Sequence, residues 1–437
     1  MGRYDVDLND YFATRLVDQP LTTQSAAAYD LKRFLKFLWD NRNRTSWRVA
    51  TAEDRAVFRH WRVSDAAGPR VDLVTWDREV ATVNQFYVWA LNHGHAKWNP
   101  FVLRESRSRD PRRRSSEHTP AEASHKGRRN DVEWLPPAAY RQWRDVGIRG
   151  FTAQGLPDRS FRGRFASRNA AYCDLMIRTG LRLSEQTSLS VFDLPEPVAG
   201  LRQLRSMLPQ PIAKGGSGRR IYYPASVLKD VWDYVETDRA EAIESARKNG
   251  TYERVRDPLL VTDSQRPFVI VAGQRLAMAK LGHAERRRVL IDTGDGVEPA
   301  ALWLNRHGLP SHPSGWQEVF DLANERCDRV GVSSRCHPHV LRHSFAVITL
   351  EQLWRGHIEE MAQMAPGQRQ TYQMVFGDPL NWVRMRLGHS SVETTQIYLH
   401  TLQELEMETR MALVPDNWEP TGVHPDDLDE MVAADAL

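Results

Sequence analysis

The sequence is poor in cysteine and has no long apolar run. Its 437 residues include three cysteines, Cys173, Cys327 and Cys336, whose scattered positions give neither a disulfide framework nor the paired spacing of a zinc site. No stretch of 18 apolar residues is present, which argues against a membrane span. The N-terminal residues lack the apolar core of a signal peptide. We therefore expect a protein of the reducing cytoplasm, without a metal, a cofactor or a membrane partner.

Basic residues are missing from the C-terminal end. Residues 415–437 contain seven acids and no Lys or Arg, whereas the whole chain has 59 Lys and Arg against 56 Asp and Glu. Leaving out those seven acids leaves 59 basic against 49 acidic residues, a charge of +10 for the body. A basic body suits a polyanionic partner such as nucleic acid, although charge runs are more often solvated surface.

Apolar periodicity predicts a helical N-terminal part. One amphipathic helix is expected over 22–39, with Thr22 or Thr23 as its cap, and a second over about 77–91. Residues 104–130 then hold nine basic residues, four acids and few apolar groups, which predicts a basic linker.

After Trp134 the pattern is that of a larger mixed domain. Helices are expected over 169–179, ending at Gly180, over 228–235 and over 316–327, and Pro338 suits the first turn of another. Two strands near 208–213 and 220–224 flank a glycine-rich hairpin turn, 215–218. Residues 250–300 give no clear pattern.

Four short segments carry side chains suited to chemistry. Arg182 and Glu185 follow Gly180, Lys214 precedes the glycine-rich turn, and two further segments read His-Pro-His-Val-Leu-Arg-His (337–343) and Leu-Gly-His-Ser-Ser-Val-Glu-Thr-Thr-Gln-Ile-Tyr (387–398). Each has a structural explanation when taken singly. Arginines pair with glutamates, hairpin lysines are usually exposed, and a tyrosine such as Tyr398 is usually half-buried packing.

Taken together and in this order, these segments resemble the tyrosine recombinase/integrase family, over nearly the whole chain. The resemblance implies a catalytic set of Arg182, Lys214, His339, Arg342, His389 and the nucleophile Tyr398, supported by Glu185. It also implies a mainly α fold: an all-α, SAM-like core-binding domain (1–103), a basic linker (104–133), an α+β catalytic domain with a small antiparallel sheet (134–413) and an acidic tail (414–437). The domains would close on DNA as a C-shaped clamp.

The chemistry of DNA strand exchange gives an independent reason for these residue types. Attack on a phosphodiester builds charge on its non-bridging oxygens, and Arg182 and Arg342 can offer forked, permanently charged donors to them. His389 can add a hydrogen bond. The phenol of Tyr398 is a weak nucleophile that needs a base, for which His339 is the candidate, and Lys214 can protonate the departing 5′-oxygen. The resulting phosphotyrosine bond allows resealing without ATP or a metal.

Partners follow from the same resemblance. We expect double-stranded DNA, self-association as a tetramer on two DNA sites, and accessory DNA-bending or directionality proteins, in a bacterial or phage cytoplasm close to the nucleoid. Steeply salt-dependent DNA binding is expected through basic side chains. The predicted DNA-binding residues are Lys32, Arg33, Lys36, Arg112, Arg113, Arg114, Arg219 and Arg220.

The chain departs from the family pattern in length. Arg342 and His389 are 47 residues apart, with the added length between 352 and 381, and the segment 236–300 is also enlarged. Residues 402–437 could dock on a neighbouring subunit or simply keep the protein soluble. Four other readings stay open: a catalytically silent DNA-binding regulator, a type IB topoisomerase, a telomere-resolving enzyme, and a zinc hydrolase that uses His337, His339, His343 and His389.

Overall fold

The fold is known from a computed structural model. It describes residues 5–101, 103–106, 117–120, 132–364 and 378–413. The chain divides into two compact units, Met1–Arg129 and Asn130–Leu437, and each is described by itself. Among the described residues, no helix is both long and apolar enough to cross a membrane.

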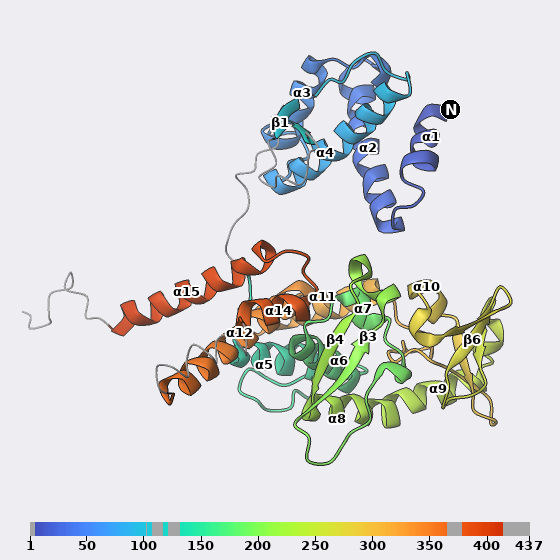
Figure 1. The fold of residues 1–437 in the computed structure, drawn as a ribbon, viewed down its shortest axis with the longest axis vertical. Coiled ribbons are helices and arrows are strands. Elements are labelled where there is room, and N and C mark those ends of the chain that lie inside the picture. Colours follow the sequence, from blue (N-terminus) through green and yellow to red (C-terminus); the bar gives the residue numbers. More distant parts are fainter. Residues whose placement is uncertain (1–4, 102, 107–116, 121–131, 365–377, 414–437) are drawn as a thin grey trace, which may run out of the picture. The chain divides into compact units, whose positions relative to one another are not determined.

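The first unit is a helical bundle followed by a short strand pair (Figure 1). Its helices pack through an aromatic-rich core in which Phe34, Phe58 and Tyr87 meet edge to face. The predicted helices at 22–39 and 77–91 are confirmed and are longer than expected. The elements are α1 (Val6–Arg15), α2 (Leu21–Asn41), the 3₁₀ turn Trp47–Val49, α3 (Ala52–Val63), α4 (Leu73–Asn92), β1 (Leu103–Ser106) and β2 (Glu117–Pro120).

Helix starts in this unit follow the chemistry of capping. Thr51 and Asp54 form a reciprocal capping box at the start of α3, and the Asp72 carboxylate accepts a hydrogen bond from the Thr75 N–H at the start of α4. The expected cap of α2 by Thr22 or Thr23 is wrong. The helix begins one residue earlier, after Pro20, without a side-chain cap.

The stretch predicted as a linker contains regular structure. β1 and β2 pair antiparallel, with Leu103 opposite Pro120. The prediction relied on the low apolar content of the segment. A two-stranded ladder is held by backbone hydrogen bonds, which composition does not reveal, so these strands were not predicted. The residues between the two strands lie outside the described part of the chain.

The second unit has a helical core beside a two-stranded sheet. α6 and α8 pack against one another and against β4, and α12 and the turn at Arg144–Arg149 pack on α6 (Figure 1). The core includes Trp143, Tyr172 and Trp316, and the Tyr172 and Trp316 rings stack with centroids 3.5 Å apart. The elements are α5 (Pro137–Trp143), the π-helical turn Arg144–Arg149, α6 (Ala166–Thr179), α7 (Leu183–Thr187), β3 (Gln203–Leu208), β4 (Arg219–Pro224), α8 (Ala225–Tyr234), the π-helical turn Val235–Arg239, α9 (Ala240–Lys248) and α11 (Pro313–Arg329).

The glycine-rich hairpin is confirmed, with one strand displaced. β3 and β4 pair antiparallel, with Leu208 opposite Arg219, so β3 ends where the predicted strand began. Pro209 and Pro211 explain the shift, because proline cannot donate to a strand ladder, and a 3₁₀ turn at Gln210–Ile212 replaces the expected strand.

The enlarged segment forms a small-sheet region at one end of the second unit, coloured yellow in Figure 1. It has its own small core around Val261, Val269 and Val289. β8 runs parallel to β5 and antiparallel to β9, and β6 and β7 form a separate hairpin. The elements are β5 (Leu259–Val261), β6 (Phe268–Val271), β7 (Gln274–Ala277), α10 (His283–Arg286), β8 (Val289–Asp292) and β9 (Val297–Pro299).

Three helices complete the second unit: α12 (Pro338–Ala362), α14 (Pro379–Leu387) and α15 (Glu393–Leu413). α12 begins at Pro338 as predicted, and it packs on both α14 and α15. Asp378 caps α14 and Gly388 ends it in a left-handed conformation. The added length between Arg342 and His389 includes an extension of α12 to Ala362, and residues 365–377 and the acidic tail 414–437 lie outside the described residues.

Candidate functional site

The turn after α6 delivers the first arginine. Gly180 ends that helix with φ +65°, and a Cβ there would lie 2.3 Å from the Phe345 ring, so both the conformation and the close approach require glycine. The chain then continues into the short helix α7, where the Arg182 backbone N–H donates to Glu185 Oε2 at 3.0 Å. Arg182 is thereby fixed where the chain leaves the core.

Glu185 joins three parts of the site. Its carboxylate accepts hydrogen bonds from Arg182 Nη1 (3.0 Å), from both terminal nitrogens of Arg219 (3.1 and 2.6 Å) and from the Lys214 backbone N–H (3.2 Å). Complete burial by itself would raise the pKa of Glu185, but the hydrogen bonds and charges of the two arginines outweigh it and lower the pKa to about 2. A buried, ionised carboxylate therefore fixes the α7 turn against the β3–β4 hairpin.

A hollow of about 660 Å³ opens beside this carboxylate. Its walls include Arg182, Lys214 and His389, together with the exposed Arg220 from β4. Three of the six predicted catalytic residues, far apart in sequence, therefore surround one space.

Arg342 is buried to 4% exposure on α12. One terminal nitrogen donates to the carbonyl oxygen of Gly180 and the other to that of Leu387, so this side chain joins the ends of α6 and α14. Burial, and then the charges of Arg182 and Arg219, lower its pKa to about 9, which leaves the guanidinium charged at neutral pH.

His389 follows directly from the left-handed Gly388 that ends α14. Its Nδ1 lies 3.0 Å from the Thr395 hydroxyl, at the start of α15. Burial and the charges of Arg342 and Arg182 lower its pKa to about 3, so the ring is neutral at physiological pH and has one N–H to donate.

The predicted nucleophile is fully buried. Tyr398 is 1% exposed on α15 and packs among Phe345, Leu350 and Leu387. Its hydroxyl lies 2.8 Å from Nδ1 of His343, and burial raises the pKa of the phenol to about 12.

His339, predicted as the base for Tyr398, is exposed in the first turn of α12. Its ring centroid lies 6.4 Å from that of His343, which occupies the position beside the phenol. Burial of part of the ring, and then the charges of His337 and Arg342, lower the pKa of His339. The site therefore has two neutral histidines one helical turn apart, and the one in contact with Tyr398 is His343.

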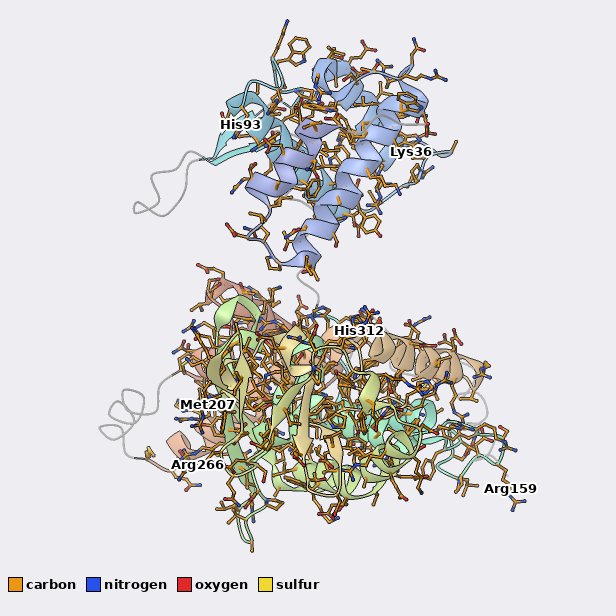
Figure 2. All side chains as sticks on the ribbon, turned by 90° about the vertical axis from the view of Figure 1, so that its right-hand side faces the viewer. Lys36, His93, Arg159, Met207, Arg266 and His312 are labelled. Carbon is orange, nitrogen blue, oxygen red and sulfur yellow. The ribbon has the colours of Figure 1, made fainter. Side chains whose placement is uncertain are left out.

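The residues predicted to bind DNA lie in different environments. Lys36, labelled in Figure 2, lies on the outer side of α2 and pairs with Asp40 at 2.5 Å. Arg33 pairs with Glu79 at 2.8 Å, and Arg33, Lys32 and Arg220 are all exposed. Arg112, Arg113 and Arg114 lie outside the described residues.

Arg219 is largely buried and engaged by neighbouring groups. It is 7% exposed, its terminal nitrogens bind Glu185, and its Nε donates to the Arg386 carbonyl at 2.6 Å. These bonds give the guanidinium a positioning role beside the hollow that it helps to line, and direct contact of Arg219 with DNA stays a prediction.

Two contributors were missed from the sequence, His343 and Thr395. His343 was quoted as part of its motif without a catalytic role, although its position four residues after His339 places both on one helix face. Thr395 had no sequence signal, because its contact with His389 depends on how α14 meets α15.

A zinc centre built from the four histidines finds no support in this geometry. Among the residues that the structure describes, no group of three or more His, Cys, Asp or Glu is arranged to hold a metal ion.

Comparison with known proteins places these features in context. No family model matches the chain. Tyrosine recombinase XerD of Bifidobacterium longum is 31% identical over 118 residues, which cover 27% of this chain and about 30% of that relative's length. Tyrosine recombinase XerC of Roseiflexus castenholzii is 24% identical over 396 residues, covering 90% of this chain and 88% of the relative.

The fold also has a counterpart among solved structures. The integrase of transposon Tn1549, in complex with transposon right end DNA, superposes with a TM-score of 0.50 at 12% identity, covering 92% of this chain and 97% of that one. The mainly helical fold with small sheets is thus that of the tyrosine recombinases. Over nearly its whole length, this chain is similar in sequence to curated tyrosine recombinases.

Proposed function

We propose that this protein is a site-specific DNA recombinase that breaks and rejoins DNA strands through a covalent link between Tyr398 and a 3′-phosphate. One observation carries the proposal: Arg182, Lys214 and His389 surround a single hollow, and the buried Arg342 lies close enough to Arg182 for their charges to interact. Cationic side chains and a neutral imidazole donor around one space suit a phosphodiester whose charge grows during the reaction.

In the proposed reaction, the Tyr398 oxygen forms a bond to phosphorus and the bond to the 5′-oxygen breaks. Arg182 and Arg342 bind the non-bridging oxygens, and His389 donates a further hydrogen bond. Lys214, exposed at the hairpin turn, gives the 5′-oxygen its proton. His339 is the candidate acceptor for the phenol proton once Tyr398 leaves its buried position, since its lowered pKa keeps it neutral.

The finer role is proposed from the similarity to tyrosine recombinases. We propose recombination at specific sites, as in integration, excision or transposition of a mobile element, by a tetramer on two DNA duplexes in the cytoplasm. The match to an integrase in complex with transposon DNA supports this choice.

Trapping the covalent link tests the proposal. We would incubate wild type and Tyr398→Phe with nicked duplexes made from the DNA that flanks the gene. A denaturing gel would report the adduct and a native gel would report binding in the same tubes. An adduct for wild type alone, with binding by both proteins, is the expected result. Binding of wild type without any adduct would contradict the reaction and favour a DNA-binding regulator.

A further inference from the structure

The walls of the hollow come from separate elements. Lys214 lies at the start of the glycine-rich turn between β3 and β4, and His389 follows the end of α14. Gly215, in the turn, has φ +66°, and a Cβ there would meet no atom of the described residues within 4 Å. Because packing gives the turn little support at that point, the position of Lys214 depends on what holds the strands beside it.

Arg386, in the last turn of α14, joins that helix to β4. Its carbonyl oxygen accepts a hydrogen bond from Arg219 Nε at 2.6 Å, and its own Nη1 donates to the carbonyl oxygen of Arg220 at 3.2 Å. The helix and the strand also pack against one another. One residue of α14 therefore binds two consecutive residues of β4, once through its backbone and once through its side chain.

Two aromatic rings hold the Arg386 guanidinium. Its central carbon lies 4.5 Å from the ring centroid of Tyr222, on β4, and 4.7 Å from that of Trp382, one turn earlier on α14. The centroids of the two rings are 5.8 Å apart. A planar guanidinium stacks well on aromatic faces, and both distances are within the range of cation–π attraction. The stack thus adds a side-chain contact between strand and helix to the two hydrogen bonds.

Arg386 is also half-buried at the edge of the hollow, so a direct effect of its charge on a phosphate is the rival explanation. The geometry favours a structural role, because the guanidinium lies against two rings and one terminal nitrogen is bound to the strand. Forked binding of a phosphate would need those terminal nitrogens free.

We propose that Arg386 is a positioning residue that fastens β4 to α14 and so keeps Lys214 in place beside the hollow. When this fastening is lost, the turn that carries Lys214 shifts, and protonation of the departing 5′-oxygen is the step that suffers. The consequence in cleavage rests on the proposed function, whereas the fastening of the strand is a property of the protein without DNA.

Two nicked duplexes with different leaving groups test this role in single-turnover reactions. One keeps the 5′-oxygen that bridges to phosphorus, and in the other sulfur replaces it. Sulfur departs as a thiolate and needs no proton, because a thiol is far more acidic than an alcohol. With the oxygen substrate, Arg386→Met should form the Tyr398 adduct about a hundredfold more slowly than wild type, as expected for a misplaced catalytic group. With the sulfur substrate, the loss should be less than about threefold, since no acid is needed.

Arg220→Met is the matched control, because it removes a charge from the same hollow while the carbonyl that binds Arg386 remains. It should change the rates of both substrates by the same factor. Lys214→Ala, which removes the proposed acid itself, should show the largest selective loss. The proposal would be overturned if Arg386→Met slowed both substrates equally, or if Arg220→Met gave the same selective loss as Arg386→Met.

Hydrogen exchange tests the fastening in the full chain without DNA. Amides of β4 should exchange about tenfold faster in Arg386→Met than in wild type, the effect of losing about one hydrogen bond, and at the wild-type rate in Arg220→Met. Unchanged exchange of β4 in Arg386→Met would overturn the proposal.

Exchange in α11 reports whether the variant is folded. If Arg386→Met fails that check, Tyr222→Val, which removes one of the two stacked rings without changing the charge, decides by the same two measurements. If wild type formed no adduct with either substrate, the proposed function would fail, while exchange would still decide whether Arg386 fastens the strand.

Discussion

Glu185 is the residue on which the cationic site depends. It is fully buried, yet two arginine side chains and two backbone N–H groups bind it, so its carboxylate stays ionised. Neutralising Glu185 would remove the negative charge that Arg182 and Arg219 bind. The nearby Arg342 would lose the effect of the same charge. Removing one partner of a buried charged group is usually far more costly than the pair was worth.

The lowered pKa of Glu185 predicts the pH range over which its charge stabilises the fold. Because the folded pKa of about 2 lies below the ordinary value of 4.5, the group stabilises the fold above pH 4.5, and this is lost as the pH falls toward 2. Glu185→Gln should lower the free energy of unfolding at pH 7 by about 3 kcal/mol. This difference between wild type and variant should decrease as the pH falls from 4.5 toward 2.

Urea unfolding of both proteins between pH 2 and pH 7 would check this prediction. Glu318→Gln, which alters an exposed carboxylate on α11, serves as the control and should change stability by less than about 0.5 kcal/mol. If the difference in free energy of unfolding between wild type and Glu185→Gln stayed constant with pH, the predicted role of the charge would be contradicted.

At this scale the sequence predicted residue types better than contacts. The motifs located Arg182, Lys214 and His389, which do surround one hollow. They could not show that Arg219 is turned inward, because that depends on the carboxylate it meets across 34 residues of chain. For the same reason they could not distinguish His339 from His343 as the partner of the tyrosine.

Among the elements, the turn between α6 and α7 is the most constrained. Gly180 needs its left-handed conformation, and the Phe345 ring of α12 lies against it. The carbonyl oxygen of the same glycine accepts a hydrogen bond from Arg342. A change at this turn therefore disturbs backbone geometry, packing and an arginine contact together.

Gly180→Ala tests that constraint. We expect destabilisation of several kcal/mol, because the new Cβ is strained by the backbone and would also displace Phe345. Gly200→Ala is the matched control, since Gly200 has φ +82° and open space around it, so it should cost only about 1 kcal/mol. Thermal unfolding would compare the two, and equal losses would show that the ring contact adds nothing.

Element prediction succeeded where periodicity and capping agreed. The helices at α2, α4, α6 and α11 had regular apolar spacing, and Pro338 marked the first turn of α12. Between 250 and 300 the strands have at most four residues, too short for an alternating pattern to emerge, so this region could not be assigned. Composition alone likewise missed β1 and β2.

For the whole molecule, the main feature is that the two units have separate cores. Phe34 lies in the aromatic core of the first unit and Leu228 in the main core of the second, and both are fully buried. Neither cluster includes a residue of the other unit. We infer that each unit can unfold in its own cooperative transition.

Calorimetry of two core variants would test this independence. Phe34→Ala should cost about 3–5 kcal/mol and lower one transition, while Leu228→Ala, costing about 2–5 kcal/mol, should lower the other. Either substitution shifting both transitions equally would mean that the units unfold as one.

The cluster around Glu185 has a consequence for the whole protein. Two guanidinium groups bind one carboxylate, and a third, that of Arg342, lies close enough for their charges to lower its pKa, so the folded chain without DNA keeps a local excess of like charge. An arriving phosphate supplies the missing anion. DNA should then act first as a structural ligand, raising the melting temperature of the second unit even in Tyr398→Phe, where no bond can form.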